Sequence, residues 1–547
     1  MDEHVDGAGE GRTAVRDPKG NVSRWRDLRE WLDLVKSNGL LKSIMAPVDL
    51  DEELSAITFL ATQADDNAPA LLFENLVGDR QGSKVVSNIL GTSKERFALA
   101  MGLDPEMSVR EMITEARHLM KARIPPTLIA KSAAPVNEVI LQGKDIDITA
   151  FPAPKFWPAD GGRYIGTANV TLTRSPDSPR INSGVYRQMV VGPKRIAIYC
   201  SPGRGARLDR EAWWERGKPC EVVAAYGVDP VLFMASSMAV AMDISELDVA
   251  GALLGRPVEM TEAEHVSIPI PAHAELVIEG LMHPGDVEME GPLGEFTGYY
   301  GNERSLQPVI EIKAIHHRRS PILTAALMAR YPSSEIATGF AIMKSARILD
   351  DLERIGVPGV VSAYTIPAAI GGMAMTVVSM RQLYAGHVSQ VLALAAQCPA
   401  AAYYIKWIIA VDDDVDPTDL NQVLWALSTR CNPIENFEFM KDTWSSALDP
   451  SQYPPELRTY GSKVLINACK PHRHIKHFPQ ATMLRRGTYD RVVRRWTELG
   501  FATLPPEPVA FHPDLSPQHT VGAADKVRRR SKKNIGKTPT RGGHSRQ

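Results

Sequence analysis

A charge-free run extends from Ile355 to Met380. It is long enough to cross a membrane as a helix, which requires about 20 apolar residues. Pro358, Pro367 and the pair Gly371-Gly372 interrupt it, however, and Val and Ile cluster on either side of these breaks. Because Pro and Gly interrupt helices while buried strands are rich in Val and Ile, the run predicts two buried β-strands joined by turns.

Length and composition limit the class of protein further. At 547 residues the chain is long enough for about two to four domains. Its 44% hydrophobic and 23% charged residues are typical of soluble globular proteins, and its net charge of −2 favours neither nucleic acid nor a membrane as partner. The five scattered cysteines include no C-x-x-C pair, and the N-terminus lacks an apolar signal segment. We therefore expect a cytoplasmic protein without a structural zinc site.

The order of helical and strand-like segments predicts a multidomain protein of the α/β (α+β) class. Helical and strand-like segments alternate near both ends of the globular part, whereas its middle is rich in strand-like runs. We expect this middle part to form an antiparallel sheet or barrel. The predicted segments are a disordered tail at 1–21, an α/β portion at 22–125, the sheet or barrel at 126–320, a second α/β portion at 321–505 and a basic disordered tail at 526–547.

Local patterns predict individual elements within these segments. Three strands joined by Pro- and Gly-containing turns are expected to form a meander at 168–174, 181–191 and 195–199. Thr92-Ser93-Lys94-Glu95 is typical of a capping box that starts a helix. Asp416-Pro417 is also typical of a helix start and predicts a helix over 417–429.

A short acidic stretch, Glu288 to Tyr299, combines two carboxylates with a turn. Glu290 and Glu295 flank Gly-Pro-Leu-Gly, whose glycines and proline predict a turn rather than a helix. Apolar neighbours would raise the pKa of a carboxyl, and two close carboxyls would have separated pKa values, as an acid–base pair requires. The alternative is a solvated acidic loop, which is the more common origin of such a pair.

Arg187 lies in the middle of the strand predicted at 181–191. A guanidinium among apolar neighbours needs an anionic partner, either a structural acid or the carboxylate of a substrate. Asn182 and Arg187 are five positions apart, so a regular strand would place them on opposite faces. A bulge at Gly184 would bring both side chains to one site.

Two further groups of residues could contact a cofactor. The small and flexible side chains of Ala235-Ser236-Ser237-Met238 suit close approach to a flat ring, but they suit a tightly packed core equally well. Glu246 lies near the start of a helix predicted at 244–255. It could cap that helix or provide an oxygen ligand for Mg²⁺ or Mn²⁺.

Taken together, these residues resemble one known family. Three motifs occur in this order: Asn182-x-Gly-x-Tyr-Arg187, then Ser236-Ser237-Met238 followed by Glu246, then Glu290-Gly-Pro-x-Gly-Glu295-x-x-Gly298. The ordered set resembles the UbiD-type decarboxylases, which use a prenylated FMN, and the resemblance extends over residues 22–500. It implies an N-terminal α/β portion, a split β-barrel that binds the flavin, and a C-terminal α/β domain that covers the site and mediates oligomerisation.

The resemblance also implies a reaction and residue roles. The family interconverts an aromatic, heteroaromatic or α,β-unsaturated acid, or a coenzyme A thioester with a free carboxylate, with its decarboxylated product and CO2. Arg187, Glu290 and Glu295 match the catalytic network; Arg187 would orient the carboxylate and Glu295 would transfer a proton. The implied cofactor-binding residues are Asn182, Tyr186, Arg187, Gln188, Ser236, Ser237, Met238, Glu246 and Arg430. Asn182 and Glu246 would bind Mn²⁺ or Mg²⁺, and the implied K⁺ ligands are Ala235, Ser236 and Met238.

The sequence departs from the family at one implied metal ligand. The family usually has a His after the meander, whereas this chain reads Cys200-Ser-Pro-Gly-Arg204-Gly-Ala-Arg207. Three alternatives follow from this difference. Metal binding is weaker, a water replaces the His, or Arg204 contacts the flavin phosphate directly.

Three functions are compatible with these observations. A decarboxylase with prenylated FMN is favoured, with a small carboxylic acid and CO2 as its reactants. A flavin prenyltransferase is the expected supplier of its cofactor, and the chain is expected to form a homo-oligomer, either a dimer or a hexamer. A flavin oxidoreductase on the same type of barrel is the first alternative, although hydride transfer does not require the acid network. A non-catalytic subunit of a carboxylase complex is the second.

Overall fold

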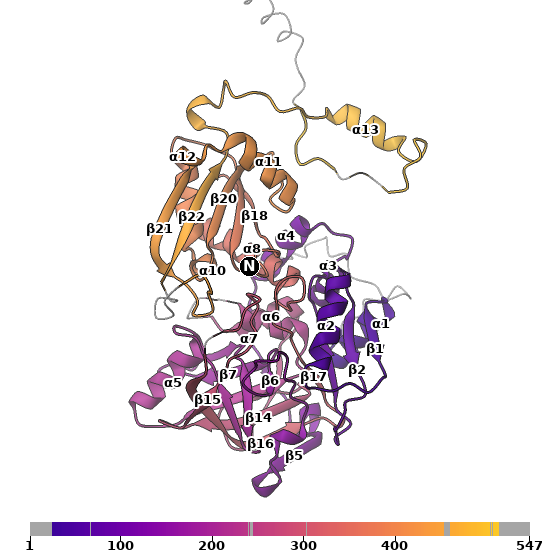
Figure 1. Cartoon of the computed structure of the whole chain (residues 1–547), viewed down its shortest axis with the longest axis vertical. Coiled ribbons are helices and arrows are strands. Elements are labelled where there is room, and N and C mark those ends of the chain that lie inside the picture. Colours follow the sequence, from indigo (N-terminus) through magenta and orange to yellow (C-terminus); the bar gives the residue numbers. More distant parts are fainter. Residues whose placement is uncertain are drawn as a thin grey trace, which may run out of the picture. The chain divides into compact units, whose positions relative to one another are not determined.

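The computed structural model describes residues 25–512, except residues 66, 239, 241–243, 302, 453–459, 504 and 506. Its contacts divide the chain into two units, Met1–Asp412 with Asp416–Arg473, and Asp413–Val415 with His474–Gln547. The tails predicted to be disordered, 1–21 and 526–547, lie outside the described residues. Sheets and helices alternate as expected within the part that is described, so the predicted mixed α/β class is confirmed (Figure 1).

The N-terminal portion is a small sheet with its helices. The strands are β1 (Leu41–Ile44), β2 (Ala70–Phe73), β3 (Lys84–Ser87) and β17 (Ile322–Thr324), in the order β1-β2-β3-β17. β17 belongs to the segment expected to start the C-terminal α/β portion, so the chain returns to this sheet after the central one. The helices are α1 (Leu28–Ser37), α2 (Glu53–Ala64), α3 (Lys94–Met101) and α4 (Val109–Leu119). Ser93 caps α3, one residue after the predicted Thr92, because its hydroxyl accepts from Arg96 N.

The central sheet has ten strands. Eight follow the order β6-β9-β10-β16-β14-β11-β7-β8, and β5 and β15 each pair with β16. The bounds are β5 (Val139–Gln142), β6 (Tyr164–Gly166), β7 (Val170–Arg174), β8 (Ile181–Gly184), β9 (Gln188–Gly192), β10 (Arg195–Ile198), β11 (Cys220–Tyr226), β14 (Leu276–Met282), β15 (Val287–Glu290) and β16 (Ser305–His317).

The connection between β8 and β9 determines the shape of this sheet. The prediction of one strand over 181–191 is wrong, because β8 pairs with β7 whereas β9 pairs with β6 and β10, near the opposite end of the sheet. Only residues 185–187 join the two strands, and so short a segment extends over at most about 14 Å. The sheet therefore curls until its two ends approach each other. This half-barrel places Arg187 in the connection.

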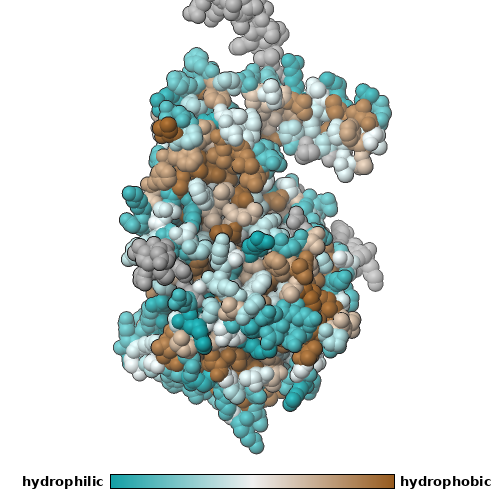
Figure 2. Space-filling model, in the orientation of Figure 1, coloured by the Kyte–Doolittle hydropathy of each residue, from teal (hydrophilic) through white to brown (hydrophobic). Residues whose placement is uncertain are grey.

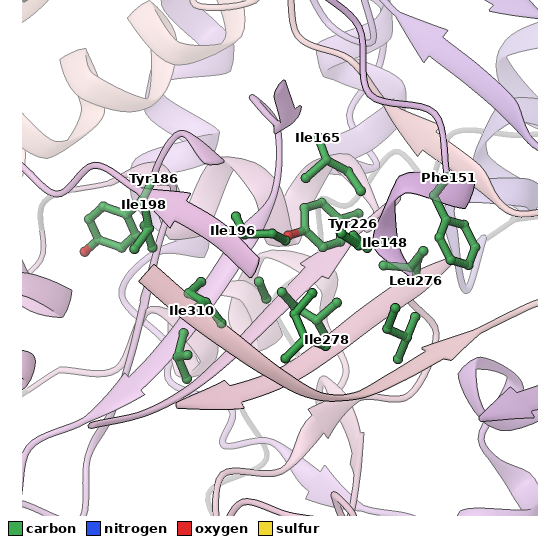
Figure 3. Packing of buried hydrophobic residues seen from close by; sticks show 14 of the residues in the cluster. Ile148, Phe151, Ile165, Tyr186, Ile196, Ile198, Tyr226, Leu276, Ile278 and Ile310 are labelled. Atoms are coloured by element: carbon green, nitrogen blue, oxygen red, sulfur yellow. The ribbon is translucent and has the colours of Figure 1, made fainter. Parts of the chain in front are cut away.

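Branched and aromatic side chains form the core of the half-barrel. Figure 3 shows Ile196, Tyr226, Ile278 and Ile310 packed against one another from four different strands. None of these four side chains is more than 1% exposed. Full burial of each such side chain contributes about 1.5–3 kcal/mol to folding, so this core fixes the strands that carry the connection.

The C-terminal sheet has the order β18-β19-β20-β22-β21. Its strands are β18 (Val360–Thr365), β19 (Met375–Met380), β20 (Trp407–Asp412), β21 (Phe437–Trp444) and β22 (Tyr460–Ala468). β18 and β19 pair in the antiparallel direction, so the charge-free run forms two strands as predicted. The accompanying helices are α8 (Thr338–Ile355), α9 (His387–Gln397), α10 (Pro399–Ala402), α11 (Leu420–Arg430) and α12 (Pro433–Asn436).

The helix predicted over 417–429 exists, but it begins later than predicted and Asp416 does not cap it. Asp419 is the N-cap of α11 and accepts from Asn421 N and Gln422 N. Asp416 instead accepts from Thr418 N and from the Thr418 hydroxyl, which forms a turn before the helix. No helix among the described residues is long and apolar enough to span a membrane.

The remaining elements are short. They are α5 (Gly205–Glu215), α6 (Pro230–Ser237), α7 (Glu246–Leu254), β4 (Thr127–Leu128), β12 (Glu259–Thr261), β13 (Ile270–Pro271) and, in the second unit, α13 (Arg486–Arg494). β4, β12 and β13 form a three-stranded sheet. Phe233, Met234 and Ser237 of α6 line the cavity described below, and so does Arg204, the residue before α5.

Candidate active site

Arg187 forms ion pairs with both carboxylates of the acidic stretch. Its Nε and Nη2 donate to the two oxygens of Glu290 at 2.9 and 2.8 Å, and its Nη1 donates to Glu295 Oε1 at 2.7 Å. The guanidinium also lies over the Tyr199 ring, 4.4 Å from the ring centroid. Glu290 is fully buried, and Arg187 and Glu295 are only 9% and 7% exposed. The alternative of a solvated acidic loop is therefore excluded for both carboxylates.

Two residues near β6 hold the acidic stretch in place. The Tyr164 hydroxyl donates to Glu290 Oε1 at 2.8 Å, on the oxygen that also accepts from Arg187. Asp160 Oδ1 accepts from Gly294 N at 2.9 Å and so fixes the turn between the two carboxylates. No role is predicted for Tyr164 or Asp160 from the sequence alone. The only local signal is the Gly161-Gly162 pair between them, which indicates a close approach of two backbones.

Gly161 provides that close approach. Its N–H donates to Pro292 O at 2.8 Å, within the turn that joins the two carboxylates. A Cβ at this position would lie 1.8 Å from the backbone oxygen of Gly291, which is far inside contact distance. The packing of the two turns therefore requires glycine here.

The pKa values of Arg187 and Glu295 are both shifted from their usual values. Burial raises the pKa of Glu295, and Glu290 raises it further, against the opposing effect of Arg187. Burial alone would lower the pKa of Arg187, but Glu295 and Glu290 outweigh it and raise that pKa. The site thus combines a permanent cation with a carboxyl group whose protonated form is accessible closer to neutral pH.

A cavity of about 290 Å³ adjoins the network, and Arg187 and Glu295 both line it. Most of the wall is apolar and rich in methionine. The methionines that line it are Met234, Met238, Met328, Met343 and Met373. Flexible thioether side chains adapt well to a flat ring system. A concave apolar site with a few convergent polar groups is the usual form of a ligand-binding site.

The residues expected to bind the cofactor are only partly on this cavity. Tyr186, Arg187, Ser237 and Met238 line it. Ser236 is buried behind Ser237, and its hydroxyl hydrogen-bonds Leu232 O and Ser183 Oγ, both at 2.7 Å.

Gln188 and Arg430 are engaged elsewhere. Gln188 is fully buried in the sheet, where its Nε2 donates to Thr171 Oγ1 at 3.0 Å. Arg430 donates to Asp412 at 2.9 Å and does not line the cavity as described. The geometry therefore gives these two residues a packing role, and contact with a cofactor stays a prediction.

Asn182 and Glu246 lie around the start of β8. Glu246 Oε2 accepts from Ser183 N at 3.0 Å and lies 3.5 Å from Arg180 Nη1. Asn182 Nδ2 donates to Thr173 Oγ1 at 3.1 Å. Burial raises the pKa of Glu246.

The segment that lacks the His passes directly over Asn182. A Cβ at Gly205 would lie 1.9 Å from Asn182 Oδ1. Within the part of the chain that is described, no group of three or more His, Cys, Asp or Glu side chains could hold a metal ion. Asn182 and Glu246 would therefore fit a divalent ion only with further oxygen ligands, such as a phosphate or water, which Mg²⁺ commonly uses.

Arg204 and Ser237 fit the phosphate of a flavin. Both line the cavity, and no carboxylate of the described residues lies within ion-pair distance of Arg204. Ala235, Ser236 and Met238 adjoin residues 239 and 241–243, which lie outside the described residues, so the K⁺ assignment stays a prediction. The Ala235 carbonyl accepts from Met238 N at 3.1 Å.

Three family models match the chain: the 3-octaprenyl-4-hydroxybenzoate carboxy-lyase N-terminal domain at 32–116, its Rift-related domain at 127–331 and its C-terminal domain at 338–468.

Among solved structures, the closed form of vanillic acid decarboxylase from Sedimentibacter hydroxybenzoicus is similar, with a TM-score of 0.79 and 27% identity over 88% of this chain and 100% of that chain. The UbiD-class enzyme HmfF from Pelotomaculum thermopropionicum, in complex with FMN, has a TM-score of 0.73 and 30% identity over 84% of this chain and 97% of that one. An evolved dimeric form of HmfF, in complex with prFMN, has a TM-score of 0.71 and 29% identity over 84% of this chain and 97% of that chain.

Proposed function

The chain belongs to the UbiD family of carboxy-lyases, and we propose that it catalyses reversible, non-oxidative decarboxylation of an aromatic, heteroaromatic or α,β-unsaturated acid with prenylated FMN. A coenzyme A thioester with a free carboxylate falls in the same substrate class. The observation that carries the proposal is the buried Arg187–Glu290–Glu295 network on the wall of the cavity. It combines a fixed cation for a carboxylate with an acid beside it.

Decarboxylation requires an electron sink, which protein side chains do not provide. Loss of CO2 leaves an electron pair on carbon, and prenylated FMN, when bound, supplies the electron sink for it. Thr167, Tyr186, Ser237 and Met238 would contact this group from the cavity wall. Arg204 would bind its phosphate, and Asn182 and Glu246 would provide oxygen ligands for a divalent ion.

Arg187 binds and orients the substrate carboxylate in this proposal. Glu290 accepts from two of its nitrogens and so fixes the plane of the guanidinium. Because the two carboxylates keep Arg187 charged, it can hold the anionic group that leaves as CO2. Correct orientation of this group over the reactive part of the cofactor lowers the barrier through proximity.

Glu295 moves the proton. Its raised pKa favours the protonated carboxyl, which can donate to the carbon that has lost CO2. In the reverse direction the carboxylate removes the same proton. Leu293, Phe296 and Leu448 line the cavity near Glu295 and limit access of water to it.

The test is direct. The chain is produced together with a flavin prenyltransferase, purified without oxygen, and its released cofactor is analysed by mass spectrometry. We expect a prenylated FMN mass and proton–deuterium exchange at the carbon that would carry CO2. Plain FMN that a nicotinamide reduces would instead indicate the oxidoreductase, and a protein that binds no flavin would indicate the non-catalytic subunit.

We also infer that the chain forms a homo-oligomer through its C-terminal sheet. Phe439 and Trp407 both pair with Val464, on neighbouring strands, so their side chains share one face of the sheet. They are 69% and 41% exposed, and Figure 2 shows hydrophobic side chains gathered over this sheet. An exposed apolar face of this kind favours association. Light scattering after size-exclusion chromatography would distinguish a dimer, a hexamer and a monomer.

A further inference from the structure

One wall of the cavity carries cations that the proposed chemistry does not use. Phe340, Met343, Lys344 and Arg347 of α8 all line the cavity. Their spacing is i, i+3, i+4 and i+7, which places them on one face of the helix. Two of the four are basic, although the surrounding wall of Ile336, Met373 and Pro399 is apolar.

Among the described residues, Lys344 has no anionic partner. The nearest polar contact of its Nζ is the sulfur of Met373, at 3.6 Å. No carboxylate among the described residues forms an ion pair with it, whereas Arg187 on the same cavity has two. An ammonium group held against apolar residues is costly unless an anion compensates it.

Arg347 is only loosely compensated. Its contacts to Asp350 and Asp351 are 3.3 and 3.4 Å long, longer than the 2.7–2.9 Å of strong charged hydrogen bonds. Asp351 also accepts from Arg354 at 2.9 Å and from Ala400 N at 2.9 Å. The buried Nε of Arg347 has no hydrogen-bond partner in the described structure.

We propose that the α8 face binds a second anionic group of the substrate, with Lys344 as its direct partner and Arg347 as support. The inference rests on the proposed function and narrows its substrate class to acids that carry a second carboxylate or comparable oxyanion. One carboxylate would bind Arg187 and leave as CO2, and the other would bind Lys344 and remain on the product. Aromatic and heteroaromatic dicarboxylates have this chemistry.

The state of Lys344 supports this assignment. Burial, together with the nearby charges of Lys463 and Arg204, lowers the pKa of Lys344 to about 7. Lys463 is already satisfied, because its Nζ donates to the carbonyls of Ala396, Ala401 and Ala402. A bound anion would restore the pKa of Lys344, so ligand and ammonium would stabilise each other.

The experiment measures binding rather than turnover. Isothermal titration of the full chain loaded with plain FMN compares benzoate with the 1,2-, 1,3- and 1,4-benzenedicarboxylates. We expect at least one dicarboxylate to bind about 10- to 100-fold more tightly than benzoate, as a charged hydrogen bond provides. Lys344→Met should remove this preference and leave benzoate affinity unchanged, and Lys344→Arg should keep it. Lys194→Met, at an exposed lysine outside the cavity, is the matched control.

Several outcomes would overturn the inference. One is the absence of any dicarboxylate preference in the wild-type protein, and another is a preference that survives Lys344→Met. Loss of FMN affinity in Lys344→Met, with dicarboxylate binding intact, would assign Lys344 to the flavin phosphate instead. Equilibrium binding does not require turnover. A failed exchange assay would therefore count against the proposed function, whereas the binding data would still test the second anion site on their own.

Discussion

Replacement of Glu295 by Gln removes a proton donor and leaves the shape of the site almost intact. The amide keeps an oxygen that can accept from Arg187 Nη1, which now contacts Glu295 Oε1 at 2.7 Å. Glu290 still holds the guanidinium through two hydrogen bonds. The variant should therefore bind substrate and flavin normally. Loss of a general acid lowers a rate by about 10²–10⁴-fold, which corresponds to about 3–5.5 kcal/mol of activation free energy.

The assay is proton–deuterium exchange catalysed by the protein with prenylated FMN, together with the flavin content of each sample. Glu288→Gln is the matched control, because Glu288 lies two residues before Glu290 on the same strand and is exposed. We expect the control to exchange at the wild-type rate. Exchange by Glu295→Gln at the wild-type rate would refute the role of Glu295. Loss of flavin together with exchange would show that Glu295 acts in binding instead.

The remaining predictions concern pH, the supporting residues and the metal. Decarboxylation by the wild-type protein should slow as pH rises through the raised pKa of Glu295, since the acid form donates the proton; a decarboxylation rate that rises with pH there would contradict this. Tyr164→Phe should slow exchange by about 5- to 10-fold, as loss of one hydrogen bond does, without changing flavin content. Gly161→Ala should displace the turn at Gly291 and lower the melting temperature and exchange together. Chelation should remove a divalent ion readily, as metal analysis would show; a stoichiometric ion that resists the chelator would contradict a site with two protein ligands.

Much of the site could be predicted because its chemistry is local in the sequence. Glu290 and Glu295 are five residues apart around one turn, and Leu293 and Phe296 in the same short stretch are buried with them. The partner of Arg187 was left open between a structural acid and a substrate, and the structure shows that Glu290 and Glu295 are its partners on the protein. The two strands of the charge-free run could also be predicted, because Pro and Gly interrupt the run at the ends of these strands.

Other features depend on pairings between distant segments. The pattern over 181–191 is continuous, and only the pairing of β8 with β7 and of β9 with β10 shows that the chain leaves one end of the sheet and joins the other. β21 was not predicted, because most of its residues are at least partly exposed and give no clear alternation. Asp416 and Asp419 are both plausible helix caps, and the hydrogen bonds of Asn421 and Gln422 decide between them.

The substrate wall of the cavity illustrates why a family resemblance stops short of a substrate. In the proposed function, Arg187 and Glu295 act on the carboxylate that the substrates of such a family share, so the motifs around them indicate the reaction but not the rest of the substrate. Phe340, Met343, Lys344 and Arg347 form an ordinary amphipathic pattern whose face could equally lie against a core or against solvent. Only the fold shows that this face lines the cavity of Arg187. Among the described residues no carboxylate pairs with Lys344, so we assign the pairing of this lysine to a second anionic group of the substrate.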